Sequence, residues 1–183
     1  MPLEIERRFL VSGDGWREHV TWEAELRQGY LLNREDGLTA RIRLQQQLNR
    51  EHQSWLTIKA LPPQGAPAHA RLEFEYPIPI EDAKALLHHS HWRVEKCRYG
   101  LQLPDGDWVL DVFSGENSPL VIAEVELQHP EDLVKVPLWC GQEVTGVHQL
   151  SNAALASHPW QRWSAEERAL IENRRLPNAS PQA

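Results

Sequence analysis

Apolar and polar residues alternate at a period of two in seven short segments of this chain. The first is Glu4-Ile-Glu-Arg-Arg-Phe9, and the others lie at 41–43, 55–59, 71–76, 96–98, 110–112 and 123–127. Successive side chains of a strand point to opposite faces, so each segment would carry one charged face and one apolar face. Strict alternation over such short runs is typical of half-buried strands.

We expect eight strands from this alternation and from the turn residues between the runs. Their approximate ranges are 3–11, 25–33, 38–46, 53–60, 70–78, 91–102, 107–114 and 119–128. Residues 80–89 and 165–175 have helical patterns, and a capping box of Ser164 and Glu167 opens the second. The loop 61–67 is expected to form a mobile flap, and the final residues 177–183 to be disordered.

The charged positions of these strands hold as many bases as acids. The acids are Glu4, Glu6, Glu73, Glu75, Asp111, Glu124 and Glu126, and the bases are Arg8, Arg41, Arg43, Lys59, Arg71, Lys96 and Arg98. An unpaired charge inside an apolar core is strongly destabilising, so this face cannot pack in such a core. It could face water on an open sheet. It could instead line the polar lumen of a closed barrel, with the apolar side chains turned outward beneath helices.

The pairing of like charges favours the lumen. Acids recur as Glu-x-Glu pairs such as Glu4 with Glu6, and like charges on one strand face repel unless a cation joins them. Bases recur as pairs such as Lys96 with Arg98, which suits a multiply charged anion. Clusters of carboxylate oxygens suit Mg²⁺ or Mn²⁺. We therefore expect the lumen to hold a small anion chelated by a metal.

The composition of the chain argues against some classes of binding partner. The chain has 183 residues, 41% of them hydrophobic, and a net charge of −7, which argues against a nucleic-acid surface. No apolar run approaches the ~20 residues that span a membrane, and the first residues lack the pattern of a signal peptide. Cys97 and Cys140 have neither a metal-site nor a disulfide spacing. We expect a cytoplasmic protein without nucleic-acid or membrane partners.

Specific motifs then indicate a family. Glu4-Ile-Glu-Arg-Arg8 resembles the N-terminal Glu-x-Glu-x-Lys signature of the CYTH superfamily, the triphosphate tunnel metalloenzymes. Further segments follow in the family's order: Arg41-Ile-Arg43, Lys59, Glu73-Phe-Glu75, Lys96-Cys-Arg98, Leu110-Asp-Val-Phe113 and Ala123-Glu-Val-Glu-Leu127. The similarity covers 1–156 as a tunnel domain and leaves 157–183 as a C-terminal helix and tail. It is greatest to small bacterial inorganic tripolyphosphatases.

This resemblance implies an α+β, mainly β fold, an eight-stranded antiparallel barrel with helices packed outside. It implies a hydrolase that uses Mg²⁺ or Mn²⁺ to cut inorganic tripolyphosphate into pyrophosphate and phosphate, and family analogy adds a homodimer. The implied metal ligands are Glu4, Glu6, Asp111, Glu124 and Glu126. The implied substrate-binding residues are Arg8, Arg41, Arg43, Lys59, Glu75, Lys96 and Arg98, and the implied catalytic residues are Glu4, Glu6, Arg8 and Glu124.

Two departures from the family pattern leave alternatives open. Arg8 stands where the signature has lysine, and its wider planar fork cannot release a proton. The segment 147–156 lacks the Tyr, Lys and Arg side chains that relatives often carry there. A class IV adenylate cyclase and a thiamine-triphosphatase would use the same tunnel. A non-catalytic module that binds polyphosphate or nucleotide is a third alternative, and Arg8 is the residue that favours it.

Overall fold

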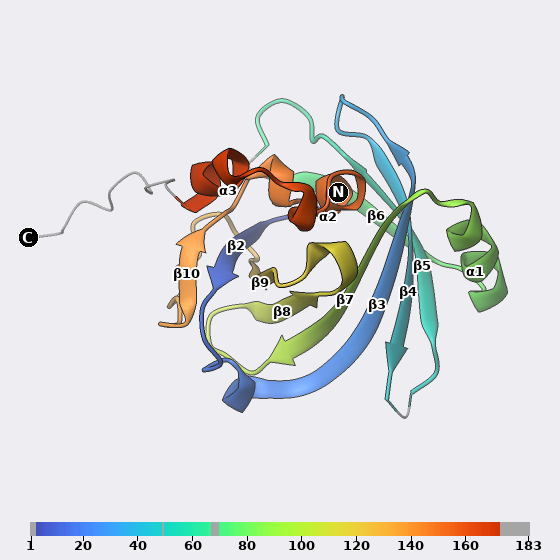
Figure 1. The fold of residues 1–183 in the computed structure, drawn as a ribbon. Coiled ribbons are helices and arrows are strands. Elements are labelled where there is room, and N and C mark those ends of the chain that lie inside the picture. Colours follow the sequence, from blue (N-terminus) through green and yellow to red (C-terminus); the bar gives the residue numbers. More distant parts are fainter. Residues whose placement is uncertain (1–2, 49, 67–69, 173–183) are drawn as a thin grey trace, which may run out of the picture.

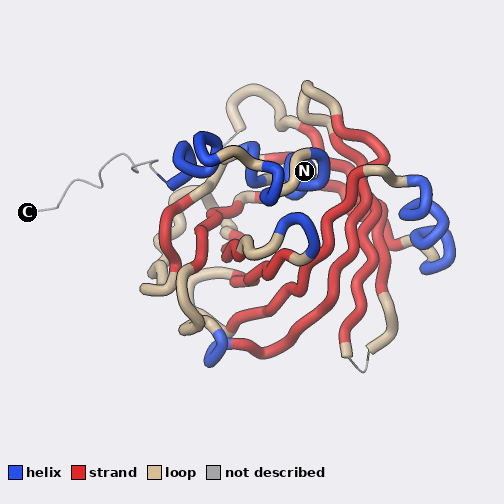
Figure 2. The backbone as a smooth tube through the Cα atoms, in the orientation of Figure 1, coloured by secondary structure: helices blue, strands red, loops and turns tan. Residues whose placement is uncertain are grey.

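One antiparallel sheet curls around the centre of the molecule (Figures 1 and 2). The computed structural model describes residues 3–48, 50–66 and 70–172. Within these ranges, ten strands pair in the order β1-β6-β5-β4-β3-β7-β8-β9-β2-β10. Their bounds are β1 Leu3–Glu4, β2 Glu6–Val11, β3 Val20–Asn33, β4 Thr39–Gln47, β5 Gln53–Ala60, β6 Arg71–Pro77, β7 Trp92–Leu101, β8 Asp107–Phe113, β9 Val121–Glu126 and β10 Cys140–Glu143.

The N-terminal segment joins the two ends of the curled sheet. Its first part, β1, pairs with β6, so that Glu4 lies opposite Arg71. Its second part, β2, pairs with β9, so that Arg8 lies opposite Glu124. Only Ile5 separates β1 from β2, and the Ile5 carbonyl accepts a hydrogen bond from the backbone N–H of Leu127. The chain itself therefore connects the two sides of the barrel-like fold.

The mainly β fold is confirmed, and the helix Ile80–His89 packs outside the sheet as expected, whereas the helix Asn152–Ser157 packs against the interior. The strands also differ from the prediction in detail. The structure has ten strands where the sequence predicted eight, because the run 3–11 is divided at Ile5 and β10 is added. Residues 140–143 lack apolar/polar alternation and pair irregularly with β2, so periodicity could not reveal them. β3 begins at Val20, five residues before the predicted start, because its first part pairs with the end of β7.

Short helices connect the strands, and α1, η3 and α2 cover different parts of the sheet. The helices and 3₁₀ turns of the described residues are η1 Arg17–His19, α1 Ile80–His89, η2 Gly115–Asn117, η3 His148–Leu150, α2 Asn152–Ser157, η4 Trp160–Arg162 and α3 Ala165–Glu172. α1 has the predicted bounds and packs outside β3, β4 and β5 (Figure 1). Its close approach requires Gly29 on β3, where a Cβ would lie 2.7 Å from Leu87 Cδ2. We call η3 and α2, residues 148–157, the plug segment.

The C-terminal helix begins as predicted. The Ser164 backbone N–H donates to Glu167 Oε2 at 2.7 Å, and the Glu167 N–H donates to Ser164 Oγ at 3.2 Å, which forms the capping box. The end of the predicted helix, 173–175, and the predicted tail, 177–183, lie outside the described residues. The flap at 61–67 and the boundary between 156 and 157 stay predictions. In the described part of the chain, every helix is too short or too polar to cross a membrane.

Apolar side chains pack on both sides of the sheet, and their positions delimit the interior. Phe9, Leu110 and Val125 lie on the face opposite to the charged residues, in a cluster with Trp139 and its neighbours. A second cluster contains Val94, Phe113 and Ile122, which share the face of the charged residues, and it includes Leu150 and Leu155 of the plug segment. This second cluster fills one end of the barrel. The charged side chains occupy the rest of the interior.

Candidate active site

The interior of the barrel holds a cavity of about 310 Å³, which we call the lumen. Twelve of the fourteen charged strand positions line it, and the other two, Lys96 and Asp111, lie buried behind its wall. Glu126 lines it from an exposed position at the end of β9. The charged face therefore lines an interior cavity, although the described strands curl around it in a linear order that hydrogen bonds do not close. Six polar or small residues that the sequence analysis did not single out as site residues also line it: Gln28, Tyr30, Thr39, Ser151, Asn152 and Ala153.

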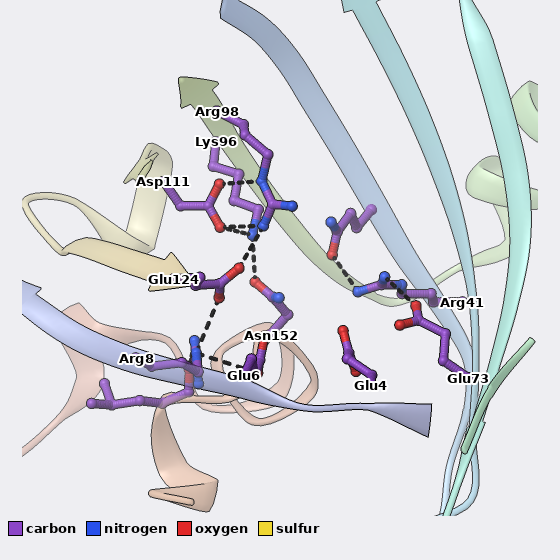
Figure 3. Close-up of polar contacts among 12 residues, drawn as sticks. Glu4, Glu6, Arg8, Arg41, Glu73, Lys96, Arg98, Asp111, Glu124 and Asn152 are labelled. Carbon is purple, nitrogen blue, oxygen red and sulfur yellow. Dashed lines mark hydrogen bonds and ion pairs between the residues drawn. The ribbon is translucent and has the colours of Figure 1, made fainter. Parts of the chain in front are cut away.

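A chain of alternating charges runs across β7, β8, β9 and β2 (Figure 3). Asp111 is 0% exposed and accepts hydrogen bonds from Lys96 Nζ and from Arg98, whose Nε and Nη2 each lie 2.7 Å from one of its oxygens. Arg98 Nη2 also donates to Glu124 Oε2 at 2.7 Å, and Glu124 Oε1 accepts from Arg8 Nε at 3.0 Å. Both oxygens of Asp111 are engaged by cations here, and its role as a metal ligand stays a prediction.

Two of these cations also hold the plug segment. Arg8 Nη2 donates to the Leu150 carbonyl at 3.0 Å, and Lys96 Nζ donates to Asn152 Oδ1 at 3.0 Å. Arg8 thus contacts Glu124 and the plug at the same time, which its guanidinium fork permits and a lysine ammonium would do less well. The substitution of arginine for the family's lysine therefore has a structural consequence in this chain. The plug contributes two acceptors to these cations rather than a further base.

A second group of ion pairs lies on β1, β4, β5 and β6. Lys59 Nζ lies 2.5 Å from Glu4 Oε2 and 3.2 Å from Glu73 Oε2. Arg41 Nη2 donates to Glu73 Oε1 at 3.4 Å, and Figure 3 shows the Arg41 and Glu73 side chains facing each other. These contacts place two carboxylates and two cations on one side of the lumen. The carboxylates compensate the cations while no anion is bound.

Glu75 completes this group of ion pairs, whereas some arginines retain donors without partners. The Glu75 oxygens accept hydrogen bonds from Arg43 Nη2 at 3.0 Å and from Thr57 Oγ1 at 2.8 Å. Yet the buried Nε atoms of Arg41, Arg43 and Arg71 have no hydrogen-bond partner among the described residues. A buried donor without a partner is costly, and an anion in the lumen would supply acceptors. The arrangement suits a ligand with many oxygens, such as a phosphate chain.

The charge states differ between neighbouring carboxylates. Burial raises the pKa of Glu6 to about 7, and repulsion by Glu124 adds to the effect. Burial alone would also raise the pKa of Glu124, but the attraction of Arg98 and Arg8 outweighs it and holds that pKa well below its usual range. For Lys96, burial lowers the pKa to about 8 even though Asp111 opposes the shift. Glu124 is therefore ionised at neutral pH, whereas Glu6 is partly protonated.

The lumen carboxylates that repel one another fit a divalent cation. Burial raises the pKa of Glu4 and of Glu126, and each lies close enough to another carboxylate for repulsion to contribute. Glu4 and Glu124 likewise repel Glu6. A hard cation such as Mg²⁺ or Mn²⁺ takes oxygen ligands and would relieve this repulsion. Among the described residues, no three acidic, histidine or cysteine side chains are already arranged around a metal position, so binding would draw these carboxylates together.

Comparisons with known proteins agree with this geometry. The sequence profile of the CYTH domain matches residues 2–156. The chain belongs to the CYTH family. A relative, an inorganic triphosphatase of Acetivibrio thermocellus, is 34% identical over 165 residues, which is 89% of this chain and 99% of the relative. An inorganic triphosphatase of Nitrosomonas europaea is 39% identical over 160 residues, or 84% of this chain and 96% of the relative.

Solved structures with the same fold were also found. The crystal structure of the inorganic triphosphatase NE1496 superposes on this CYTH chain with a TM-score of 0.56 at 35% identity, covering 85% of this chain and 95% of that one. A structure of the PH1012 protein from Pyrococcus horikoshii, 19% identical with a TM-score of 0.50, shares the fold. It covers 70% of this chain and 81% of that one.

The residues that sequence reasoning missed lie in positions where charge gave no signal. Gln28 and Tyr30 follow Leu26 at a period of two on β3, but this face of the strand carries no charge. Their neighbours across the β3–β4 ladder, Arg43 and Arg41, would have marked them once the strand register was known. Asn152 and Ser151 reach the lumen from the plug segment, outside any strand. Only tertiary packing brings them to the site.

Proposed function

We propose that this chain is a divalent-metal-dependent triphosphatase that hydrolyses inorganic tripolyphosphate to pyrophosphate and phosphate. The observation that carries the proposal is a cavity inside the curled sheet, lined both by arginines whose buried Nε atoms have no partner among the described residues and by carboxylates that repel one another. Two relatives named inorganic triphosphatases, at 34% and 39% identity, support it. Phosphoryl transfer depends mainly on positioning and on charge stabilisation, and both can come from such a lumen.

The cations of the lumen would hold the phosphate chain. Arg41, Arg43 and Lys59 extend from adjacent strands, and Arg98 faces them from β7. Guanidinium groups recognise phosphate through parallel charge-assisted hydrogen bonds, so these side chains fix the chain in one register. Arg98 and Lys59 would also offset the negative charge that grows on the departing pyrophosphate. Lys96 supports the site from behind its wall through Asp111.

The carboxylates would hold the metal. Glu4, Glu6, Glu124 and Glu126 provide the oxygen ligands, and Asp111 remains a fifth candidate. When bound, the ion supplies charge neutralisation of the phosphates and raises the acidity of the attacking water. The carboxylates that do not ligate it orient that water by accepting its hydrogen bonds.

Non-catalytic binding of polyphosphate is the second candidate, and one contact favours it. Arg8, which replaces the lysine of the family signature, is engaged by Glu124 and by the Leu150 carbonyl. If Arg8 keeps these contacts when ligand binds, the reacting phosphate loses the cation that the signature normally supplies. Such a chain would bind a triphosphate without cutting it.

Phosphate release distinguishes the candidates. Purified protein is mixed with tripolyphosphate, ATP or thiamine triphosphate in the presence of Mg²⁺, Mn²⁺ or EDTA, with Glu124→Gln as the control. Release from tripolyphosphate that EDTA and the substitution both abolish is the expected result. Tight tripolyphosphate binding without release would favour the binding module. Preferential attack on ATP, with cyclic AMP as the product, would favour the cyclase.

Location and assembly also stay predictions. We propose a cytoplasmic homodimer without nucleic-acid or membrane partners, as expected from the sequence and from family analogy. Light scattering on the purified chain gives the oligomeric state directly, and cell fractionation gives the location.

A further inference from the structure

Trp55 on β5 contacts one of the lumen arginines through the face of its ring. Trp55 and Arg43 lie directly opposite each other in the β4–β5 ladder, so both side chains point to the same face of the sheet. The guanidinium carbon of Arg43 lies over the Trp55 ring, 4.7 Å from the ring centroid. Arg43 lines the lumen, whereas Trp55 is not among the described residues that do so. The indole therefore packs against a guanidinium that faces the lumen.

The charges around Arg43 explain why its position requires support. Burial, and then repulsion by Arg41 two residues away, lower the pKa of Arg43 to about 10, although Glu75 opposes the shift. Among the described residues, Glu75 alone forms an ion pair with Arg43, and its other oxygen lies 3.9 Å from Arg41 Nη2. One carboxylate thus serves two repelling cations. The negative face of an indole attracts a cation, most strongly where water is excluded, and so stabilises Arg43 in this position.

Stacking fixes the guanidinium without using its hydrogen-bond donors. The N–H groups of a guanidinium lie in its plane, so contact with a ring face leaves them available at the edge. Arg43 Nη2 donates to Glu75 Oε2 at 3.0 Å, and the buried Nε has no partner among the described residues. A carboxylate in place of Trp55 would occupy these donors. The ring instead orients Arg43 and leaves Nε for an acceptor that a ligand provides.

We propose that Trp55 is a positioning residue, which holds the Arg43 guanidinium in the orientation that its donors require for binding the phosphate chain. The inference rests on the proposed triphosphate substrate and assigns a role to an uncharged residue outside the lumen lining. Without the ring, repulsion from Arg41 would spread the flexible Arg43 side chain over several rotamers. Ordering that side chain would then oppose binding, and the apparent affinity would fall with the fraction of competent conformers.

The test is a double-mutant cycle on the affinity for tripolyphosphate, measured by calorimetry in EDTA so that no turnover occurs. Trp55→Leu is expected to raise the Kd by about 3- to 10-fold, the value of a desolvated cation–π contact. Trp55→Phe keeps a smaller aromatic face and should fall between Trp55→Leu and the wild type. In an Arg43→Gln background, Trp55→Leu should change the Kd by less than about 2-fold, because the residue through which Trp55 acts is gone.

A control variant and a ligand-free measurement separate positioning from a general effect on the fold. Trp92→Leu is the matched control, because Trp92 on β7 is 42% exposed and is not among the described residues that line the lumen. Its Kd should equal that of the wild type. In NMR spectra, the Arg43 Nε–H resonance is identified by its loss in Arg43→Gln. It should move to higher frequency in Trp55→Leu, where the shielding by the ring is lost, and stay in place in Trp92→Leu.

The outcomes distinguish this inference from the proposed function. An unchanged Kd in Trp55→Leu would overturn the positioning role even if the wild type hydrolyses tripolyphosphate. An equal loss of affinity in the Arg43→Gln background or in Trp92→Leu would also overturn it. Wild-type binding without turnover, with the expected dependence on Arg43, would refute the hydrolase and leave the positioning role standing, whereas no binding by the wild type would overturn both. If urea unfolding shows that Trp55→Leu does not fold, Trp55→Phe carries the test in both backgrounds.

Discussion

Replacing Asp111 by asparagine tests the central ion-pair chain most directly. The amide keeps the shape of the side chain but removes its charge, and Asp111 is 0% exposed with cationic donors from Lys96 and Arg98 (Figure 3). Removing one partner of a buried ion pair leaves the other charge uncompensated and costs about 3–5 kcal/mol. Glu124 still accepts from Arg98 at 2.7 Å, so part of the compensation remains. We expect a loss of about 3 kcal/mol in the free energy of unfolding.

Lys96 limits the loss of stability in Asp111→Asn, and the pH dependence of unfolding reveals this effect. Burial already lowers the pKa of Lys96 to about 8, and Asp111 is the largest influence that opposes this. Without that carboxylate the pKa falls further, so Lys96 loses its proton near neutrality instead of remaining as a buried cation. The penalty of Asp111→Asn should therefore be larger in acid, where Lys96 must stay protonated, than in mild alkali.

Urea unfolding followed by tryptophan fluorescence, in EDTA, measures this penalty. Asp36→Asn is the control, because Asp36 pairs with Arg34 at 2.6 Å while both side chains remain more than half exposed. An exposed pair is worth ~0–1 kcal/mol, so the control should stay close to the wild type. If Asp111→Asn is no less stable than the control, the buried chain of charges does not stabilise the fold and the reasoning is refuted.

Three further predictions follow from the same site. Arg8→Lys should lower the free energy of unfolding by about 1–3 kcal/mol, because the Leu150 carbonyl and Glu124 lose a shared donor group, as urea unfolding would show. Glu124→Gln should reduce metal-dependent phosphate release from tripolyphosphate by at least ~100-fold, while calorimetry in EDTA still detects tripolyphosphate binding. The pKa of Glu6 in the folded protein is raised from 4.5 to about 7. The stability that its protonated form contributes is therefore fully present below pH 4.5 and is lost as the pH rises through about 7. Glu6→Gln should therefore stabilise the metal-free protein more in mild alkali than in mild acid, as urea unfolding at the two pH values would measure.

Each of these predictions has an outcome that contradicts it. Unchanged stability in Arg8→Lys would mean that the plug segment does not depend on the guanidinium fork. Full turnover by Glu124→Gln would remove Glu124 from the metal site. An equal effect of Glu6→Gln at both pH values would mean that Glu6 titrates in the folded protein as it does in the unfolded chain.

The alternation of charges predicted the lumen because it is a property of single strands. Glu4, Glu6 and Arg8 share one face in any strand, whatever the partner strands are. Their partners could not be predicted, because pairing depends on the register between strands. Asp111 is a clear example, since the sequence grouped it with Glu124 and Glu126, whereas the β7–β8 register places it against Arg98. A shared face does not reveal which acid faces a cation and which remains for a metal.

The contacts of the plug segment could not be predicted from sequence periodicity, for a different reason. Its contact with Arg8 uses the Leu150 carbonyl, a backbone atom that any residue type would provide. Its contact with Lys96 uses Asn152, a single polar side chain on a helix of six residues. Neither feature has a repeat that a sequence pattern could detect. The sequence shows that 147–156 lacks the basic side chains of relatives. Only the structure shows that hydrogen-bond acceptors of the plug contact the strand cations instead.

The pairing of the lumen charges has a consequence for how a metal and a triphosphate would bind. Glu4 bonds Lys59 and Glu124 bonds Arg98, so each of these four groups has a partner that a ligand must replace. A metal alone would free the cations without neutralising them, and a triphosphate alone would free the carboxylates. Either ligand by itself therefore leaves one sign of these lumen charges uncompensated. A metal–triphosphate complex satisfies both halves together, because carboxylates turn to the ion as cations turn to the phosphates. The seven acids and seven bases predicted from the sequence are balanced for that exchange, and this balance explains why so polar an interior can fold before its ligand arrives.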